Sequence, residues 1–326
     1  INMNNFKKIG LTALAASLVS VSAHAGALTA TGSASMNTEG HSGEELDAGT
    51  TFSMANSVTL AGSGELDNGL TVSVSFEMDQ GTGNNSAKGF DSHSVTVSSD
   101  TLGTLTLAGH GGSTSASKID TTAAGDMWDN FDEMTIGATT TQNAAKTSGA
   151  GNNSFFYASP DLMDGLNVTL SYNPQKANAG PSEIGYGVNY TGVEGLSVSY
   201  AETDIETTSA STSGDNSVLK LSYAYGPVTF TYSDMETNIP TNNLAGDTDS
   251  YALSYTVTDD LSVTYGSETH TQDAQATDTE VDGISVAYTT GGMTISAAMQ
   301  SAENLNHSTN THMDVDYWAL GASFAF

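Results

Sequence analysis

The sequence contains no cysteine and no arginine, and it has few long apolar runs. Without cysteine, the fold cannot depend on disulfides, even in an oxidising compartment. Apolar residues make up 37% of the chain, below the roughly 45–50% that is usual in globular domains. Beyond the N-terminal segment, no stretch approaches the ~20 apolar residues of a transmembrane helix. We therefore expect neither a disulfide scaffold nor a helical membrane anchor in the remainder of the chain.

Positive charge is also scarce. The seven basic residues are all lysine and stand against 37 aspartates and glutamates, so the formal net charge is −30. Such an excess repels nucleic acid and anionic lipid and attracts cations. An acidic surface also keeps proteins soluble in salty surroundings, so the total charge alone does not identify a function.

The N-terminus has the three parts of a secretory signal. Lys7 and Lys8 precede an apolar run over residues 9–21, and Ala23-His24-Ala25 has the form of a cleavage site. This arrangement predicts a signal peptide over residues 1–25. A buried N-terminal helix is the alternative.

Residues 26–326 divide into sixteen runs in which apolar and polar residues alternate. In one of them, Val72, Val74 and Phe76 carry the apolar phase, whereas the opposite phase is mostly Ser, Thr, Gly, Ala and Asn. A period of two indicates strands with unlike faces. The predicted runs cover residues 27–36, 51–64, 69–80, 90–99, 103–110, 152–160, 165–175, 182–191, 195–205, 215–226, 227–237, 248–258, 260–269, 279–290, 292–302 and 311–326.

Tight turns alternate with long polar loops between these runs, as expected for an even-stranded, closed barrel. The polar phase consists of small hydroxylated residues, which suit a water-filled interior better than a protein core. Tyrosines lie at run ends, where an aromatic girdle would be. They are Tyr172, Tyr190, Tyr200, Tyr232 and Tyr288. We predict an all-β protein, a 16-stranded antiparallel transmembrane β-barrel; a soluble all-β fold is the alternative.

The longest segment without strand alternation, residues 109–151, contains an acidic and amphipathic patch at residues 126–134. If the patch is a short helix, Asp126, Asp129 and Glu133 share one face. The other face then carries Met127, Phe131 and Met134, with Trp128 beside them. Long loops within compact proteins are usually functional. We predict that this loop folds into the lumen and narrows the pore.

The predicted constriction residues are the acids of the long loop and one lysine in the polar phase of its run: Asp120, Asp126, Asp129, Asp132, Glu133 and Lys220. The carboxylates of Asp126, Asp129 and Glu133 could also bind Ca²⁺ through their oxygen atoms. Apart from this, no cofactor is expected.

Signals for catalysis are weak. Carboxylate pairs arise by chance among 37 acids, and the histidines do not have zinc-like spacing. His110 precedes Gly111-Gly112-Ser113, but a nucleophile elbow is absent. We therefore expect no enzyme activity. A barrel protease or phospholipase and an acidic surface adhesin are the alternatives.

Several stretches together resemble the general diffusion porins of Gram-negative bacteria, especially the alphaproteobacterial type. They are residues 65–79, 102–109, 153–160 and 165–172, together with the terminal Phe326. The resemblance covers residues 26–326. It implies a homotrimer of 16-stranded barrels in the outer membrane, each with its third external loop folded inward. The family usually places arginines opposite this acidic loop, and this chain has none.

These observations predict a passive, water-filled channel that admits small hydrophilic solutes and prefers cations. For the trimer interface, the first run offers an apolar phase of small residues suited to close packing. This phase comprises Leu28, Ala30, Gly32, Ala34 and Met36, and Gly109 and Ala322 continue it.

Overall fold

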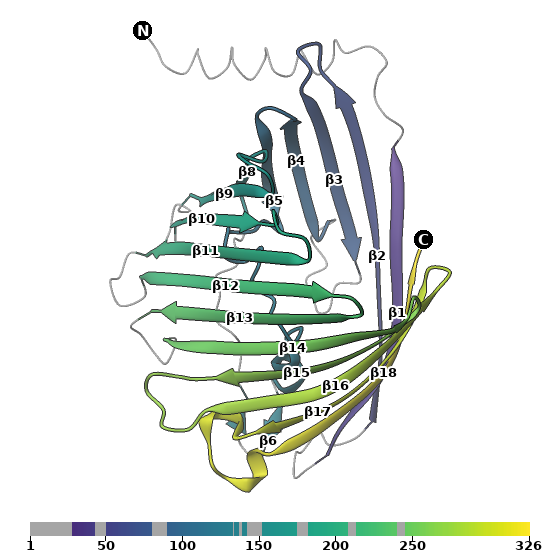
Figure 1. The fold of residues 1–326 in the computed structure, drawn as a ribbon, viewed down its shortest axis with the longest axis vertical. Coiled ribbons are helices and arrows are strands. Elements are labelled where there is room, and N and C mark those ends of the chain that lie inside the picture. The colour runs from purple at the N-terminus through teal and green to yellow at the C-terminus, as the bar shows by residue number, and fades with distance from the viewer. Residues whose placement is uncertain are drawn as a thin grey trace.

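The computed structural model describes residues 28–42, 50–79, 90–132, 134–136, 139–141, 152–174, 182–207, 213–239 and 245–326. In these residues, sixteen strands form a closed antiparallel barrel in which each strand pairs with its neighbours along the chain, and β1 pairs with β18 (Figure 1). The predicted fold class is confirmed. The predicted signal peptide, residues 1–25, lies outside the described part of the chain.

The barrel strands are β1 (Thr29–Ser42), β2 (Thr50–Glu65), β3 (Thr71–Asp79), β4 (Ser92–Ser99), β5 (Gly103–His110), β8 (Ser154–Ala158), β9 (Leu166–Asn173), β10 (Ser182–Tyr190), β11 (Leu196–Glu206), β12 (Gly214–Tyr225), β13 (Val228–Asn238), β14 (Gly246–Thr258), β15 (Leu261–His270), β16 (Thr279–Thr290), β17 (Met293–Glu303) and β18 (Val315–Ala325). A separate small sheet pairs β6 (Thr135–Ile136) with β7 (Thr139–Thr140). The short 3₁₀ helices are η1 (Met127–Phe131), η2 (Leu305–His307) and η3 (Thr311–Met313). No helix in the described ranges is long and apolar enough to cross a membrane.

Two predicted strand ends were wrong. The first run was expected to end at residue 36, but β1 continues to Ser42 because β2 and β18 both pair with it beyond that point. The last run was expected to begin at residue 311, but β18 begins at Val315 because Thr311–Met313 forms η3.

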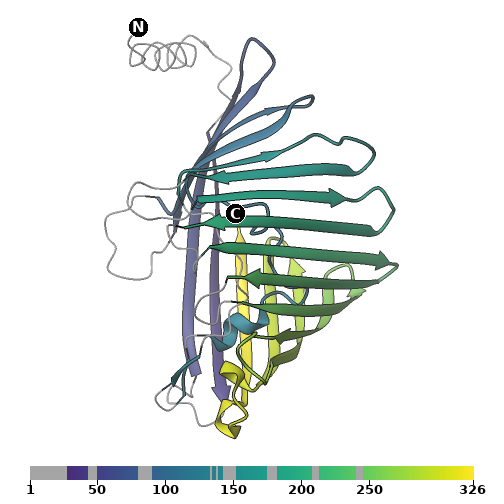
Figure 2. The same cartoon turned by 90° about the vertical axis from the view of Figure 1, so that its left-hand side faces the viewer.

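The two faces of the wall differ as the alternation predicts. On β14, Tyr251 and Leu253 are 47% and 51% exposed, whereas Ser250 and Ala252, which alternate with them, are 0% and 4% exposed. The exposed apolar residues form the outer face, and the small residues point to the interior. The strands wrap around an interior that contains η1 (Figure 2). A hollow barrel of this kind requires small polar residues on its inner face.

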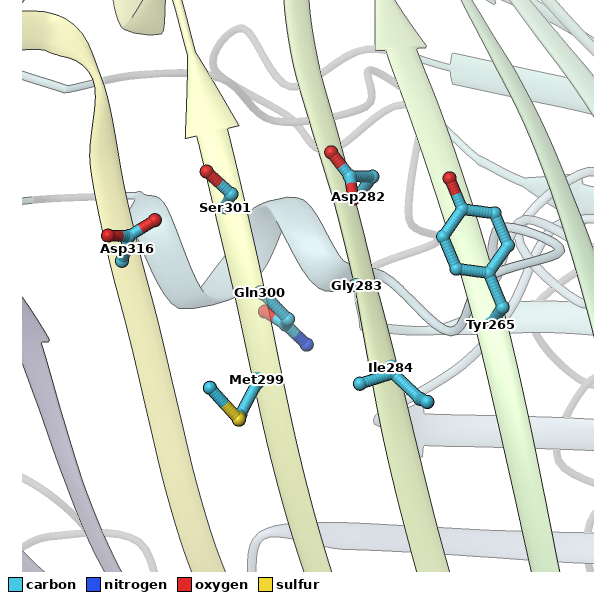
Figure 3. A pocket seen from close by; sticks show the side chains of 8 residues that line it. All are labelled: Tyr265, Asp282, Gly283, Ile284, Met299, Gln300, Ser301 and Asp316. Carbon is cyan, nitrogen blue, oxygen red and sulfur yellow. The ribbon is translucent and has the colours of Figure 1, made fainter.

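The outer face changes abruptly from apolar to acidic near one end of β15–β18 (Figure 3). A cross-strand row of large residues, Tyr265, Ile284, Met299 and Trp318, is followed two positions along by a polar row, Ser267, Asp282, Ser301 and Asp316. Two residues of a strand span about 7 Å. A shallow hollow of about 370 Å³ crosses this boundary.

On other strands, tyrosine hydroxyls at the same boundary donate hydrogen bonds to outward-facing carboxylates. Tyr186 Oη donates to Glu202 Oε2 (2.6 Å), and Tyr232 Oη donates to Asp249 Oδ1 (2.7 Å). A considerable part of the negative charge of the chain therefore faces outward at one rim of the barrel.

The end of the last strand closes the barrel against β1. Gly32 N–H donates to Phe326 O (2.8 Å), and Phe326 N–H donates to Gly32 O (3.0 Å). A Cβ atom at position 32 would lie 2.5 Å from the Phe326 ring, so glycine is required there for the ring to cover the strand. Farther along the same seam, Tyr317 Oη donates to Glu39 Oε2 (2.8 Å).

Candidate functional site

The segment between β5 and β8 lies along the inner face of the wall, attached by side chains from successive strands. Wall hydroxyls accept hydrogen bonds from its backbone N–H groups: Ser171 Oγ on β9 from residue 115 (2.9 Å), Ser233 Oγ on β13 from residue 123 (2.9 Å) and Ser250 Oγ on β14 from residue 124 (3.3 Å). Buried N–H groups need such partners. The small hydroxylated inner phase thus also serves to bind this segment.

Glu268 on β15 makes the most extensive of these attachments. Its side chain is fully buried. It accepts from the N–H groups of Met127 and Trp128, both at 3.0 Å, and from the hydroxyl of Thr122. The first N–H groups of a helix have no partner within the helix. The residue at the start of η1, Asp126, makes no side-chain capping hydrogen bond to the helix, and the wall carboxylate satisfies two of these N–H groups instead.

His270 adjoins this carboxylate on the same strand. Its Nε2 lies 3.5 Å from Glu268 Oε2, and both side chains are buried. Its Nδ1 lies 3.0 Å from Thr248 Oγ1 on β14. Glu268, which holds the segment, is therefore itself in contact with His270, and His270 with Thr248 on the neighbouring strand.

The far end of η1 is attached to the strands that close the barrel. Asn130 Nδ2 donates to Gln300 Oε1 on β17 (2.9 Å). His41 Nε2 on β1 lies 2.7 Å from Asn130 O. Because a carbonyl oxygen can only accept, this His41 nitrogen carries the proton. The segment thus spans from β9 to β1 across the interior.

An apolar cluster fixes the other side of η1. Met127, Phe131, Met134 and Ile136 are buried against residues of β16–β18 and of the connection between β17 and β18, namely Val281, Ala302, Leu305, Met313, Val315 and Tyr317. Met127, Phe131 and Met134, which were predicted to share the apolar face of a helix, all lie in this cluster, although Met134 lies beyond the end of η1. Burial of such side chains contributes about 1.5–3 kcal/mol each.

The predicted shared face for Asp126, Asp129 and Glu133 is wrong. The helix is a 3₁₀ helix limited to Met127–Phe131, so only Asp129 lies within it. Asp126 precedes it with a left-handed φ of 55°, and its carboxylate accepts from Thr122 N–H (2.8 Å). The Asp126 carboxylate therefore closes a turn of the segment.

The other predicted constriction residues differ in exposure. Asp129 is exposed, whereas Asp120 and Asp132 are half-buried. Glu133 lies outside the described residues. Asp120, Asp129 and Asp132 each interact with further groups, so none of them is an isolated charge.

Lys220 lies on the inner face, as its phase predicted. It is half-buried, and its Nζ donates to Thr121 O (2.6 Å). Asp126 and Asp120 lie close enough to interact with it electrostatically. Lys220 therefore attaches the segment to β12 and places one positive charge beside two of the loop acids.

The predicted calcium site has no further support. In the ranges that the structure describes, no three acidic, histidine or cysteine side chains converge as metal ligands. Because Glu133 is outside these ranges, calcium binding stays a prediction.

One glycine allows the segment to approach the wall closely. A Cβ atom at Gly266 would lie 2.7 Å from Ala124 Cβ and 3.3 Å from Met127 Cε. Here the absence of a side chain makes room for the segment.

The sequence interpretation missed Glu268. A signal was present, since Glu268 stands in the inner phase of its strand, between Gly266 and His270, where small residues prevail. Its partners lie 140 and 141 residues away, and the alternation within one strand gives no register for a contact with a distant segment.

Comparisons with known proteins agree with this architecture. The family model described as Gram-negative porin matches residues 10–326. No curated protein matches the chain. Among solved structures, the anion-selective porin from Comamonas acidovorans superposes with a TM-score of 0.64 at 17% identity, covering 92% of this chain and 99% of that one.

Two mutants of the Rh. blastica porin are also similar. A fivefold mutant has a TM-score of 0.66 at 14% identity, and one with an introduced tryptophan has a TM-score of 0.66 at 15% identity. Both alignments cover 92% of this chain and 100% of the other. At these identities the superpositions show the fold, whereas the family match shows membership. The chain belongs to the Gram-negative porins and is an integral outer-membrane protein that forms a passive channel.

Proposed function

We propose that the channel prefers cations and that the inward segment between β5 and β8 forms its acidic constriction. The observation that carries this proposal is the attachment of the segment to the inner face from β9 to β1. A segment that crosses the interior narrows the open cross-section, and its acids then lie beside the path of a solute. Among the described acids of the segment, Asp129 is exposed, whereas Asp120, Asp126 and Asp132 are half-buried.

The effect of the loop carboxylates on passing ions depends on distance. At physiological salt the Debye length is about 8 Å, so carboxylates at a narrow point act across the whole opening. Low-dielectric walls strengthen this effect. Lys220 lies close enough to Asp126 and Asp120 to interact with them electrostatically, and its single positive charge offsets only part of the charge of the loop acids.

The fold itself does not determine ion preference. The Comamonas porin is anion-selective at 17% identity to this chain. Selectivity must therefore follow from the charges of each chain, and here the acids dominate.

Two measurements test the proposal on the wild-type protein. Liposome swelling with neutral sugars of graded size should show passage of small sugars and exclusion of large ones. In planar bilayers under a tenfold KCl gradient, the reversal potential should have the sign of K⁺ preference, with a limit of about 59 mV. A reversal potential of the opposite sign contradicts the cation preference, and cleavage of lipid or peptide without sugar passage would favour an enzyme.

We also propose that three barrels associate through the small outer face of β1. Ala30 and Ala34 contribute small side chains to it. Two of the predicted glycines are already covered: the Phe326 ring lies over Gly32, and the His93 ring lies over Gly109. A substitution at Gly32 would therefore also displace the Phe326 ring and could not test the interface alone.

Ala34→Leu is the sharper test of the trimer. The added side chain should prevent close packing between barrels, so light scattering in mild detergent should show dissociation to monomers. Val257→Leu adds bulk to the outer face of β14 and serves as the control that remains trimeric. A wild-type protein that is monomeric by the same measurement would overturn the trimer.

We further propose that residues 1–25 direct export and are removed. Protein isolated from the outer membrane should begin at Gly26 in N-terminal sequencing.

A further inference from the structure

A polar hollow lies on the inner face where the inward segment begins. It has a volume of about 190 Å³ and opens between the wall and the first turn of the segment. Its lining includes four hydroxyl-bearing residues, Ser94, Thr106, Ser113 and Ser154, together with Lys118 and Phe156. A hollow rich in hydroxyls with one positive charge differs from the acidic surroundings of the rest of the segment.

Lys118 forms no ion pair with a carboxylate among the described residues, although the chain contains 37 acids. Its Nζ lies 5.8 Å from the centre of the Phe156 ring. Lys220, by contrast, is engaged by Thr121 O. The ammonium group of Lys118 is thus available to an anion that enters the hollow.

A compact turn holds Lys118 in this position. Thr114 N–H donates to Ser117 Oγ (2.8 Å), and Ser117 N–H donates to Thr114 Oγ1 (3.0 Å). Ala116, between them, is fully buried against Ala201, Val218 and Met235. Since the neighbouring residues are fixed, the lysine extends from a rigid base.

Ser154 provides an independent indication of a ligand. Its side chain is 2% exposed, and its Oγ has no hydrogen-bond partner in the described structure. A buried hydroxyl without a partner is costly and usually has an explanation. An oxygen of a bound solute in the hollow would accept from it.

We propose that this hollow is a binding subsite for the carboxylate of a small hydroxy acid that passes through the channel, an inference that rests on the proposed channel function. The carboxylate binds the Lys118 ammonium and the Ser154 hydroxyl. The hydroxyl of the solute bonds to Ser94 or Ser113, and its carbon atoms contact the Phe156 ring. One fixed positive charge matches a monoanion, whereas a dianionic phosphate would carry excess negative charge past Asp120 and Asp126.

Lactate and lactamide provide a matched pair of probes, because they have nearly the same size and differ in charge. Saturation-transfer NMR on the complete protein in detergent should give a saturable signal with lactate and a much weaker one with lactamide. Lys118→Gln should weaken lactate binding about tenfold, whereas Lys118→Arg, which keeps the charge, should remain within about threefold of the wild type. Ser154→Ala should weaken binding by a smaller factor.

The outcomes separate this subsite from the channel function. If neutral sugars enter liposomes but lactate gives no saturable signal, the subsite is wrong and the channel stands. The subsite is also wrong if lactate binds Lys118→Gln as well as it binds the wild type, because the anion then lies elsewhere. If neutral sugars do not enter, the channel function itself fails, whatever lactate does. Circular dichroism of each variant confirms that the barrel is folded.

Discussion

At the scale of single residues, one buried carboxylate and one lysine connect the wall to the inward segment. Glu268 accepts three hydrogen bonds from residues that precede or begin η1, and Lys220 donates one to the turn before it. Removing a partner from a buried polar group costs about 1–3 kcal/mol for each group left unsatisfied. Glu268, which is fully buried, should therefore determine the position of the segment more than any single hydroxyl.

Replacing Glu268 with alanine should release the start of η1, because two N–H groups and one hydroxyl lose their acceptor. We expect faster hydrogen exchange in residues 122–128 and noisier single-channel currents. The thermal unfolding of the barrel should change little, since its strand pairing remains. Glu280→Ala removes an equal charge from an exposed outward position and should leave the exchange rates unchanged. Equal exchange in both variants would contradict this role of Glu268.

Replacing Lys220 with methionine should strengthen cation preference, because it removes the positive charge beside Asp120 and Asp126. The reversal potential in a KCl gradient should move farther toward the K⁺ limit. Lys220→Arg retains the charge and should stay near the wild type. A shift toward anions in the methionine variant would show that Lys220 does not offset the loop acids.

At the scale of elements, η1 depends on its apolar side as much as on its hydrogen bonds. Phe131 is fully buried, and its ring lies near those of His41 and Tyr317, with centroids 6.0 Å apart in both cases. These contacts connect the segment to both strands of the closing seam.

Phe131→Ala should detach this side of η1 from the wall. Truncation of a buried phenylalanine costs about 3–5 kcal/mol, so the segment should become susceptible to proteases while the strands remain protected. Phe230→Ala removes an equal ring from the outer face of β13, where it is exposed, and should not change cleavage of the segment. Resistance of the Phe131 variant would mean that the apolar cluster does not anchor η1.

The sequence predicted strands far better than it predicted this helix. Alternation with a period of two is repeated along every strand, and only the end of β1 and the start of β18 differed substantially. The helical spacing of Asp126, Asp129 and Glu133 was less reliable, because a left-handed residue at position 126 begins a 3₁₀ helix. Five residues of helix provide too few turns for a periodic signal.

At the scale of the whole molecule, the distribution of acids matters more than their number. Many carboxylates on β11–β18 face outward at the rim, including Glu202, Asp249 and Asp282. A net charge of −30 therefore overstates the charge of the interior. Composition could predict a cation-rich environment, but only the register of the strands separates inner from outer acids.

The closed barrel was predictable because every strand has one apolar and one polar face. A sheet of such strands leaves no unpaired edge only when it closes into a barrel. The attachment of the segment was not predictable in the same way. Its contacts join residues more than a hundred positions apart, from Ser115 with Ser171 to Met127 with Glu268. The serines that bind the segment cannot be distinguished in the sequence from serines and threonines that would only face water in the lumen.

In the proposed channel, the acids of the inward segment, and not those of the outer rim, produce the cation preference. Two fourfold variants carry the same change in charge and test it in one measurement, the reversal potential under a tenfold KCl gradient. The loop set is Asp120→Asn, Asp126→Asn, Asp129→Asn and Asp132→Asn, and the outer set is Asp204→Asn, Asp234→Asn, Asp249→Asn and Asp282→Asn. At position 126, asparagine can still accept from Thr122 N–H.

The loop set should lose more than half of the wild-type reversal potential. The outer set should stay within a few millivolts of the wild type, because the electrolyte screens rim charges over a Debye length of about 8 Å. The difference between the sets should shrink at molar salt, where the Debye length is about 3 Å. An equal loss in both sets, or an unchanged potential in the loop set, would contradict the proposed constriction.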